Sequence, residues 1–152
     1  MTFMDKLREV KAEVDTEQGG IVLFAVLERE DPGGKFDIIF SASWIKSFED
    51  ESQATADLLQ KLQRKLAPRD LVPISRVISF HPGEELVVFI LDNLLGLGGR
   101  SHLDRFTFNG IAIARSDILA ADLTYGSIPA LPPNADAMSR QTAAELEAVA
   151  SR

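Results

Sequence analysis

The stretch "IVLFAVLEREDPGGKFDIIFSASWI", residues 21–45, decides the fold of this 152-residue chain. Two runs rich in Ile, Val and Phe flank Pro32, Gly33 and Gly34, a pattern typical of a β-hairpin. The first run is apolar at consecutive positions through Leu27, so both of its faces should be covered and it should lie inside a sheet. The segments on either side of this hairpin indicate what packs on it.

An amphipathic helix is expected on each side of the hairpin. Thr2 with Asp5 gives a capping box at the start of the first helix, and Asp50 with Gln53 gives a similar signal at the start of the second. Pro68 ends the second helix. Each helix has an apolar stripe at helical spacing: Phe3, Leu7, Val10 and Val14 in the first, and Ala54, Leu58, Leu62 and Leu66 in the second.

The second half of the chain adds a strand, a helix and another hairpin. Residues 73–80, "PISRVISF", fit a strand. Residues 84–95 taken alone could be a buried strand, but the preceding Pro82 and the following Gly96 favour a helix. Residues 105–114, "RFTFNGIAIA", predict a hairpin around Asn-Gly, and residues 117–123 can add a further strand.

The element order is therefore helix, hairpin, helix, strand, helix, hairpin. This order predicts an α+β fold, with a mainly antiparallel sheet of about five strands and three helices packed on it. Residues 1–126 are expected to form a single domain. Residues 127–152 are expected to form a Pro-rich linker and a short C-terminal tail that is helical or disordered.

The composition argues against several classes of partner and site. A net charge of −7 disfavours nucleic-acid binding. The one dense basic cluster, Lys61, Arg64 and Lys65, lies where cations complement the end of a helix. The absence of cysteine excludes disulfides and thiolate chemistry. No apolar run can span a bilayer and the N-terminal segment is charged, so we expect a cytoplasmic location and no membrane contact.

The stretch "LDNLLGLGGRSHLDR", residues 91–105, raises the possibility of a phosphate-binding loop. Phosphate loops place their glycines before a helix, whose N-terminal N–H groups then face the anion. Here the glycines follow the expected helix, so they meet its negative end. The stretch matches neither nucleotide fingerprint, and no cofactor is expected.

Two groups of residues are candidates for chemistry. His102 and Asp104 can form an acid–base pair with Arg100 nearby, which makes these three the candidate catalytic residues. Ser43, Trp44 and Lys46 lie where a strand gives way to a helix, a common place for ligand-binding residues; the structural alternative is a packing tryptophan.

Other polar residues have simpler interpretations. His81 most simply marks the entry to a helix, and two separated histidines do not make a metal site, so no metal is expected. Asp37 falls on the strand face opposite Phe36 and Ile38, where a solvated residue is expected.

These observations favour a non-enzymatic protein-binding or regulatory module, since no coherent catalytic constellation appears and a tail behind a Pro-rich linker is typical of docking segments. The alternative is a small metal-dependent hydrolase or ligand-binding enzyme with a cleft near residues 41–46 and 98–105. The partner is expected to be another protein or a second copy of the chain. Residues 35–45 carry early charges at Lys35 and Asp37 and no proline, so they predict an unprotected edge strand that pairs in a homodimer.

Overall fold

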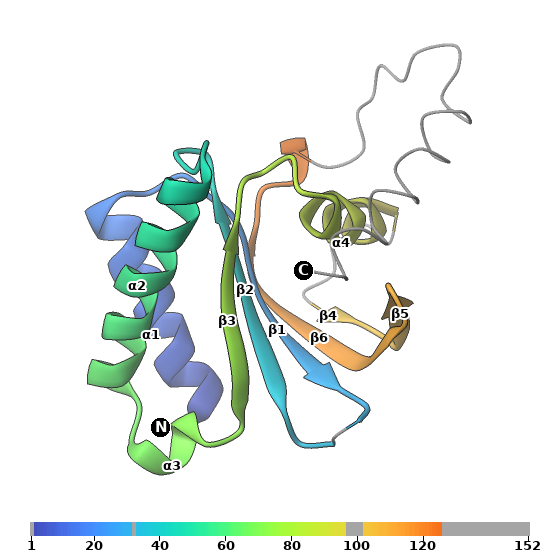
Figure 1. The fold of residues 1–152 in the computed structure, drawn as a ribbon, viewed down its shortest axis with the longest axis horizontal. Helices are drawn as coiled ribbons and strands as arrows, with labels where there is room; N and C mark the ends of the chain where they lie inside the picture. The colour runs from blue at the N-terminus through green and yellow to red at the C-terminus, as the bar shows by residue number, and fades with distance from the viewer. Residues whose placement is uncertain (1, 32, 97–101, 126–152) are drawn as a thin grey trace.

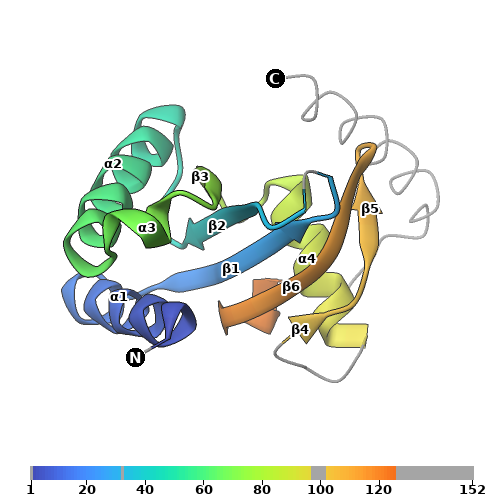
Figure 2. The same ribbon diagram turned by 90° about the horizontal axis from the view of Figure 1, so that it is seen from below.

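The computed structural model describes residues 2–31, 33–96 and 102–125. Its elements, in chain order, are α1 (Phe3–Glu17), β1 (Ile21–Arg29), β2 (Phe36–Ala42), α2 (Phe48–Lys65), α3 (Pro68–Leu71), β3 (Ile74–Phe80), α4 (Glu85–Gly96), β4 (His102–Leu103), β5 (Phe106–Phe108), β6 (Ile111–Ala121) and the 3-10 helix η1 (Leu123–Tyr125). The α+β class is confirmed, and so is the helix expected over residues 84–95. A curved sheet separates α1 and α2 on one face from α4 on the other (Figures 1 and 2).

In the described part of the chain, the sheet has six strands in the order β3-β2-β1-β6-β4, and β5 pairs with β6. Within the described residues the pairings are antiparallel apart from β2 with β3, which is parallel. That pairing is parallel because α2 and α3 form a crossover that returns the chain to the end of the sheet where β2 began. As expected, β1 is an interior strand, with β2 and β6 as its neighbours.

The expectation that residues 35–45 form an edge strand is wrong. β2 lies between β1 and β3, and β3 occupies the edge in its place. The crossover that carries β3 to this position joins segments far apart in the sequence. The local sequence pattern of β2 therefore could not predict that β3 pairs with it.

The second hairpin turns at Asn109 and Gly110, as predicted. Both residues have positive φ angles, 54° and 76°, which the type I′ turn requires at its two central positions. The separate strand expected over residues 117–123 does not form, because residues 117–121 continue β6, which runs for 11 residues from Ile111.

The core has two parts, one on each face of the sheet. The predicted stripes of α1 and α2 pack on one face around Phe24 and Ile38. On the other face, α4 packs through Val87, Ile90 and Leu91 against residues of β1 and β2. Leu7, Leu62 and Ile90 are fully buried, so both layers exclude water from the sheet.

The cap of α2 differs from the sequence expectation. Ser47 is the N-cap: its hydroxyl accepts a hydrogen bond from the Asp50 N–H at 3.1 Å, and the helix begins at Phe48. The Asp50 carboxylate accepts from the Lys46 N–H at 2.9 Å instead of capping the helix itself. The cap lies three residues before the expected position, because the Ser47 hydroxyl already accepts from a free N–H group of the first turn.

Two predicted features lie outside the described residues: the tail, residues 127–152, and most of the glycine loop, including Arg100. Among the residues that are described, no helix is long and apolar enough to cross a membrane.

Candidate binding groove

A groove of about 580 Å³ lies along the edge strand β3. Five consecutive residues of β3, from Arg76 to Phe80, line it. Successive side chains of a strand point to opposite faces of the sheet, so the groove must pass around the edge of β3 and open on both faces. It therefore has an outer wall, on the α2 face, and an inner wall, on the α4 face.

The outer wall is one side of α2. Phe48, Ser52, Thr55 and Leu59 line the groove at helical spacing, away from the buried stripe of the same helix. Phe48 is 82% exposed and Leu59 39%. The Thr55 hydroxyl donates to the Ser79 hydroxyl at 2.9 Å, which fastens this side of α2 to β3. An exposed apolar ridge thus lies beside an edge strand.

The inner wall belongs to the core on the α4 face. Leu27 and Ile39, 3% and 1% exposed, line it together with half-buried side chains of the surrounding elements. The apolar members of this wall all pack in the α4-side core: Leu27, Ile39, Ile78, Phe80, Leu86, Phe108 and Ile111. α4 lines the groove only through Leu86 in its first turn, and the β5–β6 hairpin lines it through Phe108, Asn109 and Ile111.

A buried ion cluster lies at the inner wall. Asp37 is 2% exposed. Its carboxylate oxygen Oδ2 lies 3.0 Å from Arg29 Nε and 3.0 Å from an Arg76 terminal nitrogen, and Arg76 Nε adds a longer contact of 3.4 Å to Oδ1. Two guanidiniums against one carboxylate leave an excess charge of about +1, because arginine stays protonated.

The expectation that Asp37 is solvated is therefore wrong. Its side chain does lie opposite Phe36 and Ile38, but on that face the Arg29 and Arg76 side chains pack against it. A charge buried in this way persists only with partners. Two features of the sequence could have predicted the pairing of Asp37 with Arg29. Asp37 lies inside an apolar run, and the other strand of the same hairpin ends with Arg29.

The candidate ligand-binding residues lie just beyond the end of β2. Ser43 and Lys46 are exposed, and the Trp44 ring packs 6.3 Å from that of Phe40. Gly20 approaches Ser43 so closely that an added Cβ would lie 2.5 Å from the hydroxyl. Its positive φ of 66° also favours glycine. The groove is not lined by any of the three candidates, Ser43, Trp44 and Lys46.

Two of the three candidate catalytic residues, His102 and Asp104, lie at the opposite edge of the sheet, and Arg100 lies outside the described residues. His102 pairs with Asp117 in the β4–β6 ladder, and Asp104 is exposed in the link to β5. Two strands, β1 and β6, separate β2 from β4. Residues 41–46 and 98–105 were expected to line one cleft, but their described parts are not neighbours. The catalytic role of His102 and Asp104 stays a prediction.

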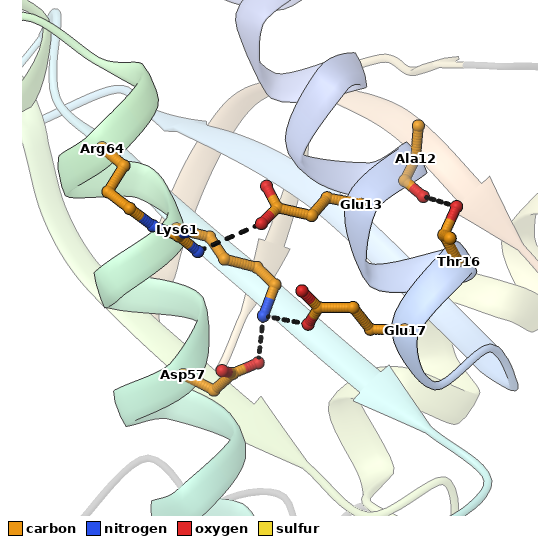
Figure 3. A network of polar contacts seen from close by, with 7 residues as sticks. All are labelled: Ala12, Glu13, Thr16, Glu17, Asp57, Lys61 and Arg64. Carbon is orange, nitrogen blue, oxygen red and sulfur yellow. Dashed lines mark hydrogen bonds and ion pairs between the residues drawn. The ribbon is translucent and has the colours of Figure 1, made fainter.

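The basic cluster of α2 joins two helices (Figure 3). Lys61 Nζ lies 2.7 Å from a Glu17 carboxylate oxygen and 2.6 Å from one of Asp57. Arg64 contacts Glu13 at 3.0 Å. Burial of Lys61 would lower its pKa, but its hydrogen bonds to Asp57 and Glu17 outweigh that effect and raise the pKa. These contacts tie α2 to α1.

No group of three His, Cys, Asp or Glu side chains in the described part of the chain is arranged to hold a metal ion. Comparisons with protein-family models, with curated proteins and with solved structures found no match to this chain.

Proposed function

We propose that this chain is a non-enzymatic protein-binding module, and that partners bind along β3 and the exposed side of α2. One observation carries the proposal. Within the described residues β3 pairs only with β2, and its free side lies next to the exposed Phe48 and Leu59. An edge strand offers unpaired N–H and C=O groups, and an extended segment of another chain can add to it as a further strand.

The residues of β3 support this use. Natural edge strands are usually protected by prolines, bulges or several charges. In β3, Arg76 is the only charged residue, and the register with β2 shifts between Ile74 and Arg76. Beyond this irregularity, Val77, Ile78 and Phe80 are half-buried apolar side chains. An added strand would hydrogen-bond to the β3 backbone and place alternate side chains against α2 and in the groove.

A second copy of the chain is the first partner to consider. A two-fold axis beside β3 would set the strand antiparallel to itself and join two sheets, and two-fold dimers are the commonest oligomers. The homodimer expected from β2 is thus proposed at β3, where an edge exists.

Photocrosslinking tests the proposal even when the identity of the partner is unknown. Benzoylphenylalanine would replace Phe48 in the full chain expressed in its native cells. The matched control is the same replacement at Val72, which is 69% exposed and does not line the groove. Crosslinks to a protein from position 48 and none from position 72 are expected, and mass spectrometry would identify a second copy or another chain. Equal crosslinking, or none from position 48, would contradict the proposal.

A further inference from the structure

We propose that the inner wall of the groove binds a small amphipathic carboxylate, with its apolar chain against Leu27 and Ile39 and its carboxylate at Arg76. This site adjoins the proposed protein-binding surface, which uses the free edge of β3 and the exposed side of α2. The inference does not depend on that function.

The size and lining of the groove suit such a ligand. Its volume of about 580 Å³ lies within the range of roughly 300–1,000 Å³ that is typical of small-molecule sites. Such sites combine mostly apolar walls with a few polar groups that fix orientation. The inner wall has this composition, because seven apolar side chains of the α4-side core surround Asp37 and Arg76.

The apolar chain of the ligand would cover surface that the protein leaves exposed. Ile78, Phe80, Phe108 and Ile111 are only half buried, although they belong to the same core as the fully buried residues beneath α4. Removing such surface from water stabilises a complex by roughly 25 cal/mol per Å² of apolar area before the costs of association.

The charge of the cluster identifies the head group. Arg76 is the accessible member, with its side chain 47% exposed, whereas that of Arg29 is 19% exposed. Its contacts to Asp37 use Nε and one terminal nitrogen. A guanidinium has five N–H donors, so three remain for a ligand, and carboxylate is the planar anion that a guanidinium fork matches best.

Charge balance favours a monoanion. The excess of about +1 in the cluster is neutralised by one carboxylate, whereas a dianion would leave a half-buried charge uncompensated. Glu51 also lines the groove, but it belongs to α2, which packs on the face of the sheet opposite the Asp37 side chain. Asp37 acts as a positioning residue here, because it holds the Arg76 side chain against the sheet.

Isothermal titration of the full chain with decanoate and with decanol, below their aggregation concentrations, tests the site. The two probes share the apolar chain and differ in the head group. Decanoate should bind at least about tenfold more tightly than decanol, a ratio worth about 1.4 kcal/mol. Arg76→Gln should remove this preference. The control Arg115→Gln, at a surface arginine that pairs with Glu28 outside the groove, should retain it.

A second measurement keeps the test valid if Arg76→Gln folds poorly. In the wild-type protein, NMR contacts should appear between the decanoate methylene protons and the Phe108 ring. Equal affinity for the two probes, absence of binding, or contacts that map elsewhere would overturn the inference. Neither measurement detects strand addition at β3, so their failure would leave the proposed protein-binding function untouched.

Discussion

Asp37 is the residue at which local pattern and tertiary environment diverge most. It follows the strand alternation and faces away from Ile38, yet it is buried and held by Arg29 and Arg76. The alternation of side chains along a strand shows which face of the sheet a residue lies on. Whether that face is exposed to solvent depends on elements far away in the sequence.

Replacement of this residue should be costly. Asp37→Ala leaves two guanidiniums facing each other at the inner wall, and we expect a loss of roughly 2–4 kcal/mol, below the 3–5 of a fully buried pair because Arg76 is half exposed. Urea unfolding at pH 7 measures this loss in the free energy of unfolding. The exposed Asp104, changed to Ala, should alter stability by less than about 0.5 kcal/mol. Similar values for both variants would show that the cluster contributes nothing.

Asp70 should contribute a pH-dependent stability. A hydrogen bond from Lys6 Nζ at 2.9 Å, helped by one from the Ala67 N–H, holds the pKa of Asp70 below its ordinary value of 3.8, while partial burial opposes this shift. The stabilisation is therefore present above pH 3.8 and disappears as the pH falls through the lowered pKa. Asp70→Asn should lower the melting temperature at pH 7, and the difference from wild type should shrink below pH 3.8. A difference that stays constant across this range would contradict the assignment.

At the scale of elements, α2 serves both the core and the groove. Its buried stripe packs on the sheet and its basic residues pair with α1, while a third side presents Phe48 and Leu59 beside β3. The predicted stripe accounts for the first role alone. The other two depend on where α1 and β3 lie.

The stripe leads to a prediction about packing. Leu62→Ala should destabilise the protein by roughly 2–5 kcal/mol, because Leu62 is completely buried and its loss leaves a cavity between α2 and the sheet. Leu59→Ala, three residues earlier on the same helix and 39% exposed, should cost clearly less. Chemical denaturation of the two variants compares them directly, and equal losses would mean that the two sides of α2 are not distinct.

At the scale of the whole molecule, charge opposes self-association. The chain carries a net charge of −7, so two copies repel each other, and added salt screens this repulsion over a Debye length of about 10 Å at 0.1 M. The proposed dimer through β3 should therefore strengthen with ionic strength. Light scattering at micromolar concentration should show a larger average mass in high salt than in low salt.

Two variants refine that measurement. Phe48→Glu should reduce the average mass towards that of a monomer, because it places a charge beside the proposed interface. Val72→Glu adds the same charge at an exposed apolar residue outside the groove and should not. A monomer mass for the wild type at every salt concentration would end the homodimer proposal.

The tail also belongs to this scale. Deletion of residues 127–152 should leave the melting temperature nearly unchanged, because Pro129, Pro132 and Pro133 interrupt regular structure and the apolar stripe of the tail is thin. Differential scanning calorimetry measures this temperature. A fall of many degrees in the deletion variant would indicate that the tail packs against the rest of the protein.

The sequence by itself determined the elements whose signals are local. The capping box of α1, the helical stripes and the Asn109-Gly110 turn depend on residues within a few positions of one another, so the α+β class, the second hairpin and the helix at α4 followed from such local signals. The interior position of β1 followed in the same way, since its run of apolar residues needs cover on both faces.

Only the tertiary structure decided which strands are neighbours outside the two hairpins, and where the groove lies. The parallel pairing of β2 with β3 needs a crossover through α2 and α3, which no local pattern contains. The groove is built from α2, β3, α4 and the β5–β6 hairpin, and its charged cluster joins three strands. Side chains from such distant segments meet only because burying both faces of the sheet fixes the whole arrangement, and the free energy of that burial is a property of the folded chain rather than of any one segment.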